Sequence, residues 1–151
     1  MAKFSGRLKR PPIVLALSQF RFATVGSIDK FVEAIHEPIR QTYPHRFPED
    51  LQEVQLSASG EASIQKNRRW QILDRRKTSG YIVDSSMIVF RTTAYIDWDT
   101  FLRETMRGVS LLIDIARPAV IDRVGLRFVD LIKPTTALPL ERQLETPLHG
   151  F

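Results

Sequence analysis

The pattern over residues 98–116 is the feature that most constrains the fold. Apolar side chains recur there at spacings of three and four, at Trp98, Phe101, Leu102, Met106, Val109, Leu112, Ile113 and Ala116. This periodicity predicts an amphipathic helix, which Pro118 ends. Asp97 and Asp99 place acceptors and negative charge at its start. A helix with one apolar stripe must bury it against another element, so the fold needs a second layer.

Strand-like segments supply that layer. Short runs rich in β-branched and aromatic residues predict strands at 13–22, 51–56, 69–73, 81–83, 87–95 and 119–132. On the fifth of these, Ile88, Phe90, Thr92 and Ala94 share one face, which we expect to be the core face. The turn residues between the middle segments indicate a meander of antiparallel strands.

A second helical pattern follows the first strand. Apolar residues at 28, 31, 32, 35 and 39 fall on one helical face, and Ser27 is placed to cap it. Pro44 and Pro48 predict a connecting loop over residues 43–50. The element order is then β-α-β-β-β-β-α-β. We expect an α+β fold, an antiparallel sheet of about five to six strands with two helices on one face, and consider it the first unit of a duplicated fold.

Length and composition fit one domain. The chain has 151 residues, and we assign residues 11–133 to the domain, 1–10 to a basic flexible tail, and 134–151 to a proline-containing tail or the remnant of a second unit. The absence of cysteine excludes thiol catalysis, zinc thiolates and disulfides. No apolar run approaches the roughly 20 residues that cross a bilayer, and no signal peptide is recognisable, so we expect a cytoplasmic protein.

The positive charge is concentrated in two segments. The net charge is 22 − 17 = +5, of which residues 1–10 contribute +4 and residues 66–77 contribute +5, so the rest of the chain sums to −4. One interpretation is a solvated tail and a solvated hairpin. The alternative is a hairpin that binds nucleic acid or another anion, through Lys66, Arg68, Arg69, Trp70, Arg75, Arg76 and Lys77. For Trp70 we favour a place in the core, because large aromatic side chains are usually buried.

No catalytic or metal-binding pattern is evident. His36, His45 and His149 lack the short paired spacing of a metal site, so we expect neither metal nor cofactor. Helix capping explains Asp97 and Asp99 without catalysis. The enzymatic alternative is an acid-base set of Asp84, Arg91 and Asp122, but we expect that the chain is not an enzyme.

The first and last predicted strands share a short similar sequence. Phe20-Arg21-Phe22 is matched by Leu126-Arg127-Phe128, at a spacing that indicates a unit of about 105 residues. We expect Arg21 and Arg127 to form ion pairs with acids such as Asp122 or Asp130.

Several motifs together resemble a known family. The motifs are Pro11-Pro12-Ile13-Val14 leading to Phe20-Arg21-Phe22, Tyr43-Pro44, Gly80-Tyr81-Ile82-Val83, Thr92-Thr93-Ala94-Tyr95 with Trp98, and Arg123-Val124-Gly125-Leu126-Arg127-Phe128. Their order resembles that in a sporadically distributed TIGR family of bacterial proteins of unknown function. The resemblance covers roughly residues 11–133. Members usually carry acids where this chain has Leu15 and Gln19, and they continue into a second half, so the chain resembles a truncated or minimal member. The resemblance implies a bacterial origin and an association with defence islands or mobile elements.

The unfinished second unit motivates the functional hypothesis. A last strand without its own helix leaves an edge or an apolar face that needs cover. We therefore expect a non-enzymatic protein-protein interaction module that self-associates or binds a partner protein through Val124, Leu126, Phe128 and Leu131. The alternatives are a strand that completes a closed monomer and, in another class, nucleic-acid binding by the basic hairpin.

Overall fold

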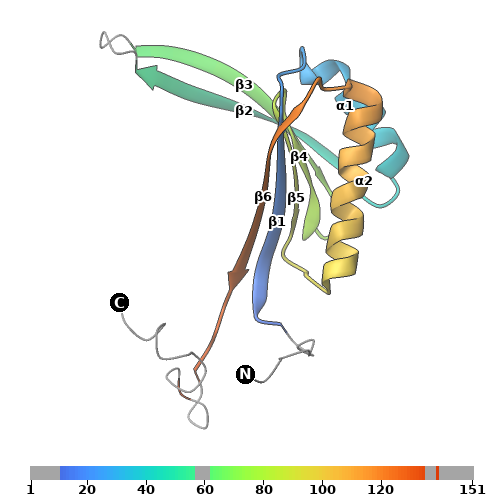
Figure 1. Cartoon of the computed structure of the whole chain (residues 1–151), viewed down its shortest axis with the longest axis vertical. Helices are drawn as coiled ribbons and strands as arrows, with labels where there is room; N and C mark the ends of the chain where they lie inside the picture. The colour runs from blue at the N-terminus through green and yellow to red at the C-terminus, as the bar shows by residue number, and fades with distance from the viewer. Residues whose placement is uncertain (1–10, 57–61, 135–138, 140–151) are drawn as a thin grey trace.

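The computed structural model describes residues 11–56, 62–134 and 139, without the side chains of 52–66. The chain forms one six-stranded antiparallel sheet in the order β2-β3-β4-β5-β1-β6. Its strands are β1 (Ile13–Phe22), β2 (His45–Leu56), β3 (Ala62–Leu73), β4 (Ser79–Val83), β5 (Met87–Thr92) and β6 (Ile121–Asp130). The helices α1 (Val32–His36) and α2 (Trp98–Ala116) lie on the same side of the sheet (Figure 1). The predicted fold class is confirmed.

The long helix α2 begins where the sequence predicts. Asp97 is its N-cap, and the carboxylate accepts a hydrogen bond from the Thr100 N–H at 2.7 Å. This contact satisfies one of the free N–H groups at the helix start, which confirms the capping interpretation. At the other end Arg117 adopts a left-handed conformation before Pro118.

The core lies between α2 and the middle of the sheet. Phe101, Val109 and Leu112 of α2 are buried together with Tyr81 of β4 and Ile88 and Phe90 of β5, among other residues. Gly108 brings the helix close to β4, since a Cβ there would overlap the ring of Tyr81. The core face predicted for β5 is confirmed for Ile88, Phe90 and Thr92, whereas Ala94 lies beyond the strand and is exposed.

The segment predicted as one helix after β1 is broken into three. Two 3₁₀ helices, η1 (Ile28–Lys30) and η2 (Glu37–Ile39), flank the five-residue α1. Ser27 forms no side-chain cap, because its hydroxyl contacts the carboxylate of Asp29 instead. Pro38 has no N–H to continue an α-helix, which accounts for the change to 3₁₀ geometry there. The apolar face was nevertheless predicted correctly, since residues 28, 32, 35 and 39 are buried.

The prediction of a loop at residues 43–50 was wrong from His45 onward. These residues begin β2, and Pro48 lies opposite Trp70 of β3 within the ladder. β2 is an outer strand, so a proline whose nitrogen faces away from β3 costs no ladder hydrogen bond. The prediction treated a proline as incompatible with any strand, and the edge position removes that objection.

The hairpin of β2 and β3 projects from the body of the sheet (Figure 1). β4 pairs only with the last four residues of β3, from Trp70 to Leu73. The earlier part of β3 therefore has β2 as its one neighbour within the described sheet. At the opposite edge, β6 is the outermost strand and runs antiparallel to β1.

Candidate interaction surfaces

The strand β6 is hydrogen-bonded along one side. It pairs with β1, and no other described strand lies beside it. The N–H of Leu131 donates to the carbonyl of Pro12 at 2.8 Å. Along an antiparallel strand, the backbone N–H and C=O groups of successive residues point alternately toward one neighbouring strand and toward the other. Since those of Leu131 point toward β1, those of Val124, Leu126 and Phe128 point away from it. They form a row of free backbone groups that another strand can extend.

Apolar side chains accompany this edge. The four residues predicted as an interface are all exposed: Val124 by 57%, Leu126 by 52%, Phe128 by 38% and Leu131 by 51%. Leu126 lies opposite Ser18 of β1, whose hydroxyl is 2.8 Å from that of Thr105 in α2. Val124, Leu126 and Phe128 therefore point to the helix side of the sheet.

Phe128 connects β6 to α2. Its ring centroid lies 5.6 Å from that of Phe101, 6.5 Å from that of Trp98 and 5.9 Å from that of Tyr95. Such aromatic contacts stabilise beyond their buried area. One end of β6 is thus packed against the helix, whereas Val124 and Leu126 remain uncovered.

One flank of α2 is also uncovered. Leu102, Met106 and Ile113 are between 39% and 45% exposed. On the opposite flank, Glu104 accepts a hydrogen bond from Tyr43 at 3.0 Å, so the exposed side chains lie on the β6 side of the helix. We call the following set the β6–α2 apolar surface: Trp98, Leu102, Met106, Ile113, Val124, Leu126 and Phe128.

The predicted basic hairpin is divided between two environments. Arg68 and Arg69 lie in β3 opposite the acids of β2. Arg68 Nε is 2.8 Å from Asp50 Oδ1, and Arg69 Nε is 2.7 Å from Glu49 Oε2. Hydrogen bonds from Arg69 and then Gln71 lower the pKa of Glu49 to about 2. These two guanidinium groups are neutralised within the chain, and Lys66 lies outside the residues whose side chains are described.

Trp70 is engaged on two sides. Its indole N–H donates to Asp29 at 2.6 Å, and the guanidinium carbon of Arg46 lies 5.4 Å from the ring centroid. The side chain also packs against the core. These contacts favour a structural role for Trp70 in the fold over a role as a platform on which bases stack.

Arg75, Arg76 and Lys77 lie in the turn between β3 and β4. Asp74 holds this turn, since its carboxylate accepts from the N–H of Thr78 at 2.8 Å. Lys77 adopts φ 57° and places its ammonium 5.4 Å from the ring of Phe47. The three bases are exposed, so the seven predicted residues do not form one basic surface.

The expected ion pairs of the first and last strands are not formed. Within the described part of the chain, Arg21 and Arg127 have no acidic partner. The sheet register instead places Arg21 opposite Arg123. This pairing of like charges depends on which strands are neighbours, and residue spacing carries no signal of it.

The three residues of the enzymatic alternative, Asp84, Arg91 and Asp122, do not lie together in one cluster. Asp84 accepts hydrogen bonds from the N–H groups of Ser86 and Met87 in the β4–β5 turn. Arg91 lies four residues further along β5 than Met87, about 13 Å away by strand rise. Among the described residues, no three His, Asp or Glu side chains are close enough to share a metal ion.

A cavity of about 230 Å³ lies between the start of α2 and the strands β4 and β5. Tyr43 and Glu104 line it. Burial, followed by the charge of Glu104, raises the pKa of Tyr43, so its hydroxyl stays protonated at neutral pH. Two other acids that line the cavity, Asp74 and Asp97, hold a turn and cap a helix, respectively. These polar groups have structural partners.

Comparisons with known proteins give no match. No family model, no curated protein and no solved structure matches the chain. Within the described ranges, no helix is long and apolar enough to span a membrane.

Proposed function

We propose that the chain is a non-enzymatic interaction module that self-associates, with the β6 edge of one copy pairing with the β6 edge of a second. The observation that carries the proposal is the open edge of β6, with its outward backbone groups next to exposed apolar side chains. β6 joins the sheet as the closed-monomer alternative requires, but its outer side has no neighbour among the described strands.

Symmetry restricts how two β6 strands pair. In an antiparallel pair related by a two-fold axis, one residue faces its own copy. An axis at Leu126 places Phe128 opposite Val124 of the second copy on the helix side. On the other face it places Arg127 opposite Gly125 and Arg123 opposite Val129. An axis at Gly125 would instead place Arg123 opposite Arg127, which is unfavourable. The charges therefore favour the register centred on Leu126.

The β6–α2 apolar surface supports the same arrangement. Extension of the sheet across β6 brings its exposed side chains toward those of the second copy on one face. Removal of apolar area from water stabilises such an association by about 25 cal/mol per Å². A backbone ladder and an apolar face then act at one interface.

A lysine at the centre of the pair tests the proposal. Leu126→Lys places two like charges opposite each other. We expect the dissociation constant of the dimer to rise at least about 100-fold, measured by sedimentation velocity over a range of concentrations. Ile96→Lys is the matched control, because Ile96 is 65% exposed and lies outside β6. A monomeric wild-type chain at high concentration, or equal weakening by both variants, contradicts the proposal.

The absence of cysteine permits a direct test of the register. In a hydrogen-bonded antiparallel pair, opposed Cα atoms lie about 5.5 Å apart, within the range of a disulfide. Leu126→Cys should therefore form a covalent dimer on mild oxidation. Val124→Cys is the control, since its two copies would be offset by four residues, about 13 Å. Cross-linking of Val124→Cys in preference to Leu126→Cys would refute this register.

A further inference from the structure

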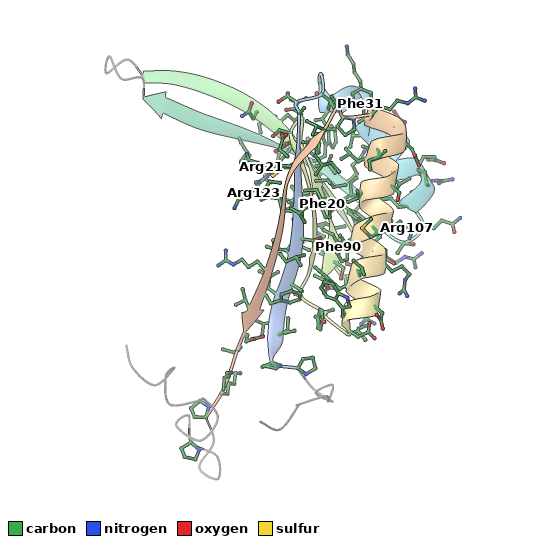
Figure 2. All side chains as sticks on the ribbon, in the orientation of Figure 1. Phe20, Arg21, Phe31, Phe90, Arg107 and Arg123 are labelled. Atoms are coloured by element: carbon green, nitrogen blue, oxygen red, sulfur yellow. The ribbon has the colours of Figure 1, made fainter. Side chains whose placement is uncertain are left out.

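Four arginines of β1, β5 and β6 lie on the sheet face opposite the helices. Arg21 of β1 lies directly opposite Arg123 of β6, and Leu17 of β1 has Arg127 on one side and Arg91 of β5 on the other. Directly opposed residues share a face, and so do residues four apart on one strand. Ser18 points to α2, so the odd-numbered positions 17 and 21 point away from it. Figure 2 shows Arg21 and Arg123 together on the side of the sheet away from α2. We call these four residues the arginine face.

None of the four arginines of the arginine face is ion-paired within the described residues, although the carboxylate of Asp122 lies near Arg21 and Arg123. Within the part of the chain that the structure describes, none of the four guanidinium groups forms a side-chain hydrogen bond either. By contrast, Arg68 and Arg69 on β3 are both paired with acids. Like charges directly opposite on neighbouring strands destabilise a sheet. An anion between Arg21 and Arg123 would offset that repulsion.

The surroundings of Arg21 and Arg123 admit a ligand. The two residues line a shallow depression of about 350 Å³ together with Phe22, Ser86 and Asp122. Asp122 makes no ion pair with either arginine. The second pair, Arg91 and Arg127, lies four residues along the strands, about 13 Å away. A ligand that contacts both pairs therefore carries several negative charges along its length.

We propose that the arginine face binds the phosphate backbone of nucleic acid without reading its sequence. Guanidinium groups match phosphate oxygens with paired donors. None of the neighbours that the register gives these arginines is aromatic, since they are Leu17, Met87 and Gly80. Phosphate contact without base stacking predicts sequence-independent and strongly salt-dependent binding. This proposal differs from the predicted basic hairpin in every residue and is independent of self-association.

Two double variants with equal charge separate the arginine face from the basic turn. Arg21→Gln with Arg123→Gln removes two charges from the face, and Arg75→Gln with Arg76→Gln removes two from the β3–β4 turn. Binding of labelled duplex DNA is measured by fluorescence anisotropy between 50 and 200 mM salt. Each duplex phosphate contact contributes about 0.9 to the slope of log affinity against log salt. Four contacts predict a slope near −3.6, and thus roughly 100-fold weaker binding across this range.

The expected results are distinct for each variant. The Arg21/Arg123 variant should lose about 1.8 of the slope, whereas the Arg75/Arg76 variant should keep the wild-type slope. Leu126→Lys should retain the slope per chain, so failure of dimerisation and failure of nucleic-acid binding are distinguishable. No binding at 50 mM salt, or an equal loss in both double variants, overturns the proposal. Equally salt-dependent binding to vesicles of anionic phospholipid also overturns it, because the site would then not select nucleic acid.

Discussion

The two edges of the sheet, β2 and β6, are built in opposite ways. β2 carries Pro48, and its acids Glu49 and Asp50 are held by arginines of β3. Proline and charge are common devices that prevent an edge strand from pairing with another chain. β6 contains no proline, and half-exposed Val124 and Leu126 lie along it. The contrast teaches that one edge is protected and the other left available, which is the physical basis of the proposed self-association.

The largest effect on stability is expected from replacing Phe128 of β6, with Phe47 of β2 as a control of similar exposure. Phe128 on β6 is 38% exposed and Phe47 on β2 is 42% exposed. Phe128 contacts three aromatic rings, whereas Phe47 stacks on His45 alone and lies under Lys77. We expect Phe128→Ala to lower the free energy of unfolding by about 2–3 kcal/mol and Phe47→Ala by about 1 kcal/mol, measured by urea denaturation. Equal losses would mean that β6 is not anchored through the aromatic cluster.

A smaller effect is expected when Pro48, which protects the β2 edge from pairing with another strand, is replaced. Pro48→Val restores one backbone N–H on an outer strand. The change is made in the Leu126→Lys background, where the β6 edge is blocked. We expect the affinity of self-association to rise less than about tenfold over that of Leu126→Lys alone, or by less than about 1.4 kcal/mol. Sedimentation velocity at high concentration measures it. If no association appears, Glu49 and Asp50 protect the edge without help from the proline.

The smallest effect concerns the ion pair of Glu49 and Arg69. The pKa of Glu49 is about 2 in the folded chain, below the ordinary value of 4.5. A depressed pKa means that the pair stabilises the fold above pH 4.5 and that this contribution is lost as the pH falls toward 2. Because the Glu49 side chain is 35% exposed, solvent screening limits the contribution to about 0.5–1 kcal/mol.

Glu49→Gln tests this ion pair. The variant should be less stable than wild type at pH 6 and equally stable near pH 2, by urea denaturation at each pH. A difference that persists unchanged at pH 2 would assign the effect to something other than the charge of Glu49.

The elements that the sequence predicted well have local causes. Asp97, the three-to-four spacing and Pro118 define α2 without reference to any other segment. The elements predicted wrongly depend on distant neighbours. The strand β2 tolerates Pro48 because of its edge position. The burial of α2 depends on distant neighbours as well, since Leu102 and Met106 stay exposed where no described element covers that flank. Periodicity identifies an apolar face but not how much of it will be covered.

The candidate surfaces divide in the same way. The four apolar residues of the last strand were identified from the sequence and are exposed, whereas the seven-residue basic segment is divided by contacts of Arg68, Arg69 and Trp70 with acids. Those acids lie about 20 or more residues away along the chain, at Asp29, Glu49 and Asp50. Residue spacing carries no signal for such pairings.

By itself the sequence determined the fold class, the long helix with both its ends and the apolar character of the last strand, because periodicity, capping and proline act within a few residues. Only the tertiary structure decided which strands are neighbours and in what register. That decision left β6 as an outer strand and brought Arg21 opposite Arg123 across roughly a hundred residues of chain. The physical reason is that strand pairing is a contact between distant segments, set by how the whole sheet buries its core.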